Sequence, residues 1–92
     1  MDAKGAAEPI AGLLYIQLGL IDFELDDLES ARRRLLTGID LSRQLGVVFY
    51  TLVGLCGLAK LQHVQGEREA AWTTLAEARE AASRSLASAE TG

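Results

Sequence analysis

The sequence has few of the residues that cross-link a small fold or interrupt its helices. Its single cysteine, Cys56, excludes an internal disulfide and the metal sites that are built from paired cysteines. Its single proline stands at position 9, so no later helix contains a proline that would break it. Positive charge is also scarce, with nine Lys and Arg against thirteen Asp and Glu and a net charge of −4. This balance argues against direct binding of nucleic acid, which needs a concentrated cationic face.

Signals for export or membrane insertion are lacking as well. The N-terminal residues MDAKGAAEP do not have the basic-then-apolar order of a signal peptide, so we expect a cytoplasmic protein. The longest uncharged stretch, residues 44–59, contains three glycines and falls short of the roughly 20 residues that cross a bilayer. We therefore expect a buried helix there. The 92 residues, 49% hydrophobic and 24% charged, indicate one globular domain over 1–92.

The apolar residues that are present predict an all-α fold. Their spacing is too dense for alternating strands, and it follows the three-to-four periodicity of helices. The predicted helices cover residues 10–25, 27–45, 48–65 and 67–86. We expect the C-terminal tail, residues 88–92, to be frayed.

Capping residues separate these helices. Asp26 is the predicted N-cap of the second helix, with Glu29 as its reciprocal partner three residues later. Gly46 and Gly66 are predicted to end the second and third helices in the left-handed conformation that favours glycine.

An internal repeat appears when the chain is shifted by 40 residues. The shift superposes small and apolar residues that would let paired helices approach closely. These predicted packing positions are Leu18, Gly19, Ala31 and Leu35 in the first copy and Leu58, Ala59, Ala71 and Leu75 in the second. We therefore predict two stacked antiparallel helix hairpins, over about 8–46 and 47–86, in a right-handed superhelix.

Residues 19–46, GLIDFELDDLESARRRLLTGIDLSRQLG, resemble the tetratricopeptide-like repeats in the sensor region of MalT-like, LuxR-family ATP-dependent transcriptional regulators. The resemblance extends over about residues 10–85. Matching positions are Gly19, Phe23, Glu24, Asp27, Leu28, Glu29, Ala31, Ile39, Leu41 and Gly46. The chain departs from the pattern at Asp22, where the family usually has an apolar residue. The second copy, with Gln62 and His63, follows it more loosely.

The resemblance implies a role in signal sensing and protein interaction, with no catalysis and no cofactor. Such regulators join a nucleotide-binding switch, a repeat sensor and a DNA-binding helix-turn-helix. This chain lacks the Gly-x-x-x-x-Gly-Lys-Ser/Thr loop that holds phosphates, so we interpret it as a piece of the sensor. Its expected partners are a protein or a small-molecule effector, together with neighbouring repeats of the intact regulator. The alternative is a free-standing helical-repeat adaptor that binds a peptide or protein.

The resemblance also implies a binding surface, because the first helix of each tetratricopeptide hairpin lines the concave face. On that face we expect Ile16, Leu20, Phe23, Glu24, Cys56, Lys60 and His63. The alternative is that several of them contact neighbouring repeats. Cys56 and His63 are separated by roughly 10 Å along a helix, too far for a catalytic pair or a shared metal ion.

The remaining charged and aromatic residues favour ordinary structural roles. Arg32, Arg33 and Arg34 point in three directions on a helix, and Glu29 can pair with the first two, which indicates a solvated face. Tyr15 and Trp72 are interpreted as packing anchors.

Counting repeats gives one further expectation. Repeat stacks usually need about three units, and two hairpins leave both end faces uncovered. We therefore expect a symmetric homodimer through an apolar end face.

Overall fold

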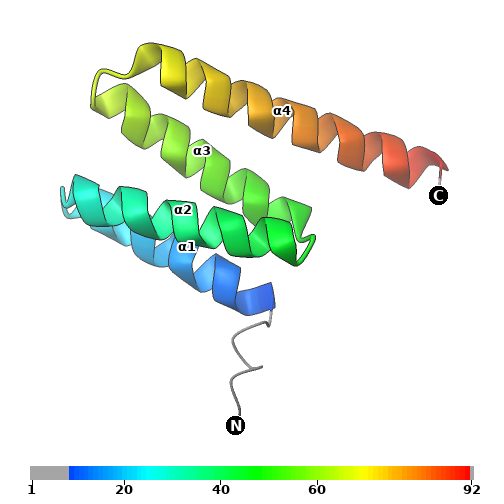
Figure 1. Cartoon of the computed structure of the whole chain (residues 1–92), viewed down its shortest axis with the longest axis horizontal. Coiled ribbons are helices and arrows are strands. Elements are labelled where there is room, and N and C mark those ends of the chain that lie inside the picture. Colours follow the sequence, from blue (N-terminus) through cyan, green and yellow to red (C-terminus); the bar gives the residue numbers. More distant parts are fainter. Residues whose placement is uncertain (1–8, 92) are drawn as a thin grey trace, which may run out of the picture.

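The computed structural model describes the backbone of residues 9–91 and the side chains of residues 10–87. This part of the chain forms four helices (Figure 1): α1 (Pro9–Glu24), α2 (Leu28–Gln44), α3 (Val48–Val64) and α4 (Arg68–Thr91). Helices α1 and α2 form one antiparallel hairpin, α3 and α4 form a second, and α3 packs on the first hairpin. The predicted fold class, all-α with two stacked antiparallel helix hairpins, is confirmed. The Cα atoms span 40 × 37 × 15 Å, so the molecule is flat.

The three turns between the helices share one geometry. Their middle residues, Asp26, Gly46 and Gly66, have positive φ angles of 66°, 73° and 82°. In each turn the next amide donates to the carbonyl oxygen five residues earlier, at 2.8 to 2.9 Å. This bond closes the preceding helix in a Schellman motif. The predicted roles of Gly46 and Gly66 are confirmed.

The predicted N-cap of α2 is wrong by one residue. Asp27 caps the helix, because its Oδ1 accepts a hydrogen bond from the Ser30 amide at 3.3 Å. Asp26 instead takes the left-handed position of the preceding turn, which aspartate tolerates better than most residues. Glu29 lies in the first turn of α2.

Helix α4 does not end near Leu86 as expected. It continues through Thr91, so residues 88–91 are helical and not frayed. The reason is local: after Arg68 the sequence contains no proline or glycine before position 92, and alanine favours the helix. Gly92, and residue 8 at the expected start of the first repeat, lie outside the described residues.

Glycines bring α1 and α2 close together. A Cβ atom on Gly38 would lie 2.7 Å from the Gly12 carbonyl oxygen and 2.6 Å from Ile16 Cγ1. At the predicted contact between Gly19 and Ala31, a Cβ on Gly19 would lie 3.1 Å from the Ala31 carbonyl oxygen. The two backbones therefore meet at separations that leave no room for a side chain at these positions.

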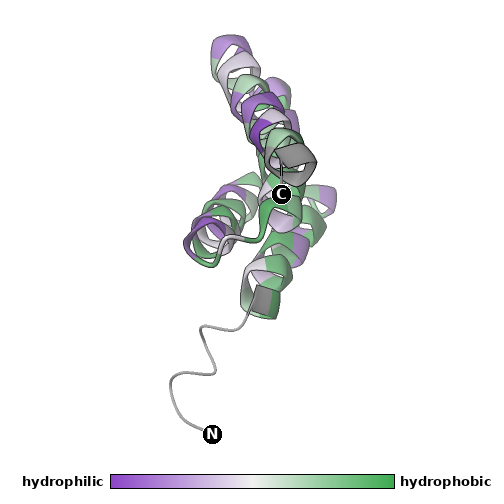
Figure 2. Ribbon diagram, turned by 90° about the vertical axis from the view of Figure 1, so that its right-hand side faces the viewer, coloured by the Kyte–Doolittle hydropathy of each residue, from purple (hydrophilic) through white to green (hydrophobic). Residues whose placement is uncertain are grey.

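Helix α3 packs between the first hairpin and α4. On one side, Leu61 packs in a fully buried cluster with Ile16, Ala31 and Leu35 of the first hairpin. On the other, Leu58 shares a second cluster with Ala78 of α4. The sequences of α1 and α3 are predominantly apolar, whereas α2 and α4 carry most of the hydrophilic residues, which Figure 2 shows as purple stretches of ribbon. The mostly apolar α3 thus has helix partners on two of its faces.

Two of the eight predicted packing positions are not buried. Gly19, Ala31, Leu35, Leu58, Ala59 and Ala71 are buried. Leu18 and Leu75 are each 42% exposed. Their equivalents 40 residues away, Leu58 and Leu35, are covered by the other hairpin. Leu18 and Leu75 lie at opposite ends of the stack, where no further hairpin covers them.

A polar pair recurs at the 40-residue spacing and supports the internal repeat. In the first hairpin, Asp22 forms an ion pair with Arg34 at 3.4 Å, with an aspartate side chain only 13% exposed. At the equivalent positions of the second hairpin, Thr74 Oγ1 donates to Gln62 Oε1 at 2.7 Å. The negative charge of Asp22, where the chain departs from the family pattern, is thus balanced by Arg34 of α2. The second hairpin has a neutral pair at the equivalent positions.

Candidate functional site

A groove of about 520 Å³ lies between α3 and α4. We call it the α3–α4 groove. Its lining contains Cys56, Ala59, Lys60 and His63 from α3 and Arg68, Ala71, Trp72 and Leu75 from α4. At the 40-residue spacing, these α3 residues are equivalent to residues of α1 that face the second hairpin. The groove therefore opens on the end of the stack that is away from α1.

The groove has an apolar floor and a cationic rim. Ala59 and Ala71 are nearly fully buried, and their small side chains leave the space between the helices open. Trp72 is 71% exposed and supplies an aromatic wall. Lys60 and Arg68 carry positive charge, and the lining contains no acidic residue. Such a surface fits a ligand that is apolar on one side and anionic on another.

The two rim cations are free to bind a ligand. Among the residues that the structure describes, neither Lys60 nor Arg68 has an ion-pair or hydrogen-bond partner for its side chain. Most of the arginines elsewhere are engaged: Arg32, Arg34, Arg43 and Arg84 form ion pairs, and Arg33 donates to Ser30 Oγ. Because the whole chain has a net charge of −4, this unpaired positive pair is a local exception in an acidic protein.

The structure splits the seven residues that were predicted to share a concave face. Cys56, Lys60 and His63 are brought together in the groove. Ile16 is fully buried, and Leu20 and Phe23 pack against the core beneath α3. The physical reason is the stack itself: the second hairpin covers this face of the first. Glu24 is exposed at the end of α1 and is not part of the groove.

Sequence reasoning missed Arg68 and Trp72. Trp72 was interpreted as a packing anchor, but most of its side chain is exposed. Spacing offered a signal, because Arg68, Trp72 and Leu75 are four and three residues apart and share one face of α4. A second signal is composition: the only Cys, His and Trp of the chain all line this groove.

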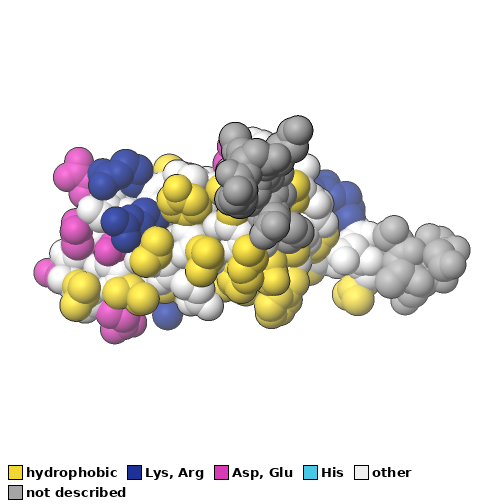
Figure 3. All heavy atoms as spheres, turned by 90° about the horizontal axis from the view of Figure 1, so that it is seen from below, with side chains coloured by type: hydrophobic (Ala, Val, Ile, Leu, Met, Phe, Trp, Pro, Cys, Tyr) yellow, Lys and Arg dark blue, Asp and Glu magenta, His cyan; other side chains and the backbone are white. Residues whose placement is uncertain are grey.

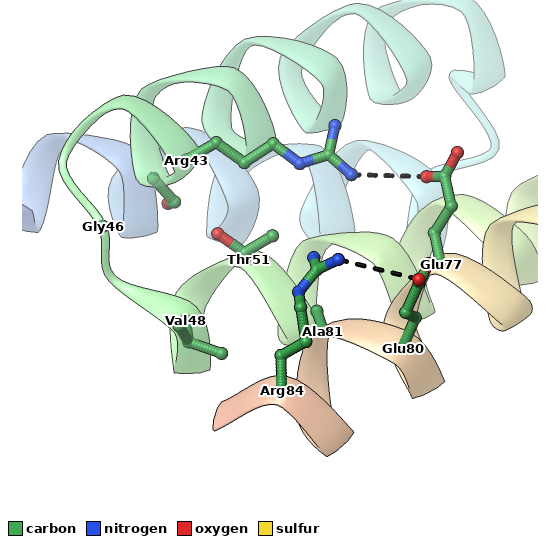
Figure 4. A pocket seen from close by; sticks show the side chains of 9 residues that line it. Arg43, Gly46, Val48, Thr51, Glu77, Glu80, Ala81 and Arg84 are labelled. Atoms are coloured by element: carbon green, nitrogen blue, oxygen red, sulfur yellow. Dashed lines mark hydrogen bonds and ion pairs between the residues drawn. The ribbon is translucent and has the colours of Figure 1, made fainter. Parts of the chain in front are cut away.

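A second hollow, of about 370 Å³, lies among the end of α2, the start of α3 and the middle of α4 (Figure 4). Its charged residues are paired with each other, Arg43 with Glu77 at 3.3 Å and Arg84 with Glu80 at 3.7 Å. The buried Ser42 has its Oγ against Gly12 of α1. With its charges already neutralised, this hollow is the weaker candidate for a ligand.

The arginine run on α2 forms no cationic patch. Arg32 pairs with Glu67 at 2.9 Å, and Arg34 pairs with Asp22 of α1. Arg33 donates to Ser30 Oγ at 3.3 Å. The first ion pair joins α2 to the turn before α4, and the second joins α2 to α1. These contacts replace the expected pairing with Glu29.

The part of the chain that the structure describes contains neither a cluster of metal ligands nor a membrane-spanning helix. In this part of the chain, no group of three His, Cys, Asp or Glu side chains is placed to hold a metal ion. None of the helices between residues 9 and 91 is long and apolar enough to span a bilayer.

Comparison of the chain with protein-family models, with curated proteins and with solved structures finds no match in any of the three.

Proposed function

We propose that this chain is a helical-repeat interaction domain whose α3–α4 groove binds an acidic, amphipathic helical segment of a protein partner. The observation that carries this proposal is the combination of an apolar floor with two unpaired cations on the rim. An amphipathic helix would lay its apolar side along Ala59, Ala71 and Leu75. Its carboxylates would then reach Lys60 and Arg68, as in other helix-in-groove complexes.

The wider role that we propose is signal sensing in the cytoplasm, as part of a MalT-like transcriptional regulator. The support is the resemblance of residues 19–46 to the sensor repeats of that family, together with the stacked hairpins. In this role the chain performs no chemistry, and partner binding would be passed to other domains. Sequencing the reading frame on both sides of this segment tests the role. A phosphate-binding loop upstream and a helix-turn-helix downstream are expected, and neither would be found beside a free-standing adaptor.

Trp72 makes groove binding directly measurable, because it is the only tryptophan and it lines the groove. The full chain is titrated with a helical peptide patterned with Leu and Glu, and separately with one in which Lys replaces each Glu. We expect the acidic peptide to shift the Trp72 emission to shorter wavelength, because binding removes water from the indole. The basic peptide should bind at least about tenfold more weakly, since it meets like charges.

Charge-reversal variants identify the surface. Lys60→Glu combined with Arg68→Glu should weaken binding of the acidic peptide at least about tenfold. Arg33→Glu is the matched control, because Arg33 is exposed on α2 and is not part of the groove. Equal binding of both peptides, or an equal loss in the Arg33 control, would contradict the proposal.

A further inference from the structure

The outer face of α1 carries a continuous apolar stripe that none of the other described residues covers. We define the α1 stripe as Ile10, Leu14, Leu18, Ile21 and Leu25, the last just beyond the helix end. These side chains are between 42% and 73% exposed. Figure 3 views the molecule from the α1 side and shows hydrophobic side chains gathered on that face. The stripe is roughly 22 Å long, since its ends are 15 residues apart at about 1.5 Å per residue.

The 40-residue repeat identifies this stripe as a packing surface. Its equivalents in α3 include Gly54 and Leu61, which face the first hairpin. A Cβ on Gly54 would lie 2.6 Å from Ile39 Cγ1, and Leu61 is fully buried against the first hairpin. The same face of α1 has no hairpin before it among the described residues. A helix that is apolar on all sides is normally buried on all sides, so we expect this face of α1 to be a contact surface.

The opposite end of the stack does not match the stripe. There the apolar residues of the first hairpin are replaced at the 40-residue spacing by polar ones. Leu20, Phe23, Leu28 and Ile39 become Lys60, His63, Arg68 and Arg79. A head-to-tail contact between two copies would bury these polar and charged side chains against leucine and isoleucine, at a large desolvation cost. An open-ended filament of this chain is therefore disfavoured. If two copies associate, the expected contact is closed and two-fold symmetric.

The stripe is complementary to itself. Its members are arranged almost symmetrically about the midpoint between Gln17 and Leu18. In an antiparallel pair of α1 helices, Ile10 therefore faces Leu25 of the second copy, and Leu14 faces Ile21. Residues 10–21 contain no charged side chain, so two copies meet without like-charge repulsion. Antiparallel helices also place their dipoles in the favourable orientation.

We infer that a second copy of this chain covers the α1 stripe, in a two-fold symmetric dimer whose α1 helices run antiparallel with Leu18 at the axis. Both α3–α4 grooves then lie at the outer ends of the dimer. The inference is independent of what the groove binds.

Sedimentation equilibrium of the full chain from about 1 to 200 μM tests the dimer. We expect a dimer in this range, and we expect only substitutions in the α1 stripe to weaken it. Leu18→Glu places two carboxylates at the axis and should raise the dimer dissociation constant at least about 100-fold. Leu86→Glu is the matched control, because Leu86 is an exposed leucine near the far end of α4. A monomer at 200 μM, or a dimer that Leu18→Glu leaves intact, would overturn the inference.

Disulfide cross-linking tests the antiparallel register separately, in a Cys56→Ser background. Two Leu18→Cys chains should form a rapid disulfide, because their Cα atoms are offset by only about 1.5 Å along the helix axis. Leu14→Cys chains are offset by about 10 Å and should not cross-link with themselves, but they should cross-link with Ile21→Cys chains. Equal self-cross-linking of Leu14→Cys and Leu18→Cys would rule out this register.

Discussion

Among single residues, Asp26 is the one that the turn geometry places under strain. It takes the left-handed conformation that Gly46 and Gly66 take in the other two turns. A side chain in this region is disfavoured by about 1 kcal/mol or more, although aspartate is among the better tolerated. The sequence has two adjacent aspartates at the start of α2, and capping preference alone does not show which of them is the N-cap. The 40-residue shift does, because it superposes Asp26 on Gly66 and Asp27 on Glu67.

Replacing Asp26 with glycine should therefore stabilise the protein. We expect Asp26→Gly to raise the free energy of unfolding by about 0.5 to 1 kcal/mol, because glycine adopts the turn without a Cβ clash. Urea denaturation followed by circular dichroism measures the change. The reverse substitution in the equivalent turn, Gly66→Asp, should lower the unfolding free energy by a similar amount. A loss of stability in Asp26→Gly would show that its side chain has a role that the turn does not reveal.

For pairs of helices, the decisive positions are those where two backbones meet. In exposed helix interiors, Gly→Ala stabilises by about 1 kcal/mol. At Gly38 the sign should reverse, because the new Cβ would lie under 3 Å from Ile16 and from the Gly12 carbonyl oxygen. We expect Gly38→Ala to lower the unfolding free energy by about 1 to 3 kcal/mol. Thermal unfolding measures it, with Ser83→Ala on the exposed face of α4 as the control for helix propensity. Stabilisation by Gly38→Ala would mean that α1 and α2 are less closely packed.

The helices themselves could be predicted from the sequence to within two residues, apart from the end of α4. Apolar periodicity shows where helices lie, and Gly46 and Gly66 show where α2 and α3 stop. The groove could be predicted only in part. Spacing places Cys56, Lys60 and His63 on one face of α3, but it does not show whether another helix covers that face. The prediction therefore included Ile16, which is buried, in the binding surface and left out Trp72, which is exposed.

In the molecule as a whole, the two hairpins are joined by an apolar contact and by ion pairs at the surface. Leu61 is fully buried in the first core cluster. Arg43 and Glu77 join α2 to α4, but both side chains are about half exposed. Solvent screens such pairs, which typically contribute less than about 1 kcal/mol. The apolar contact is therefore expected to dominate the stability of the stack.

This ranking can be tested by comparing two truncations. Leu61→Ala should lower the unfolding free energy by about 2 to 5 kcal/mol, because it leaves a cavity between the hairpins. Arg43→Ala should lower it by less than about 1 kcal/mol, and the small effect should fade in 1 M salt. Guanidinium is unsuitable because it is itself a salt, so urea denaturation is the measurement. A larger loss for Arg43→Ala than for Leu61→Ala would reverse the ranking.

The uniform turns have a consequence for how such a chain can grow. The turns follow one another every 20 residues with the same hydrogen bonds, so a duplication of 40 residues inside the chain would recreate a junction that already exists. Each duplication adds one hairpin and a fixed increment of length to the stack. The apolar stripe and the cationic groove would stay at its two ends, farther apart but otherwise unchanged.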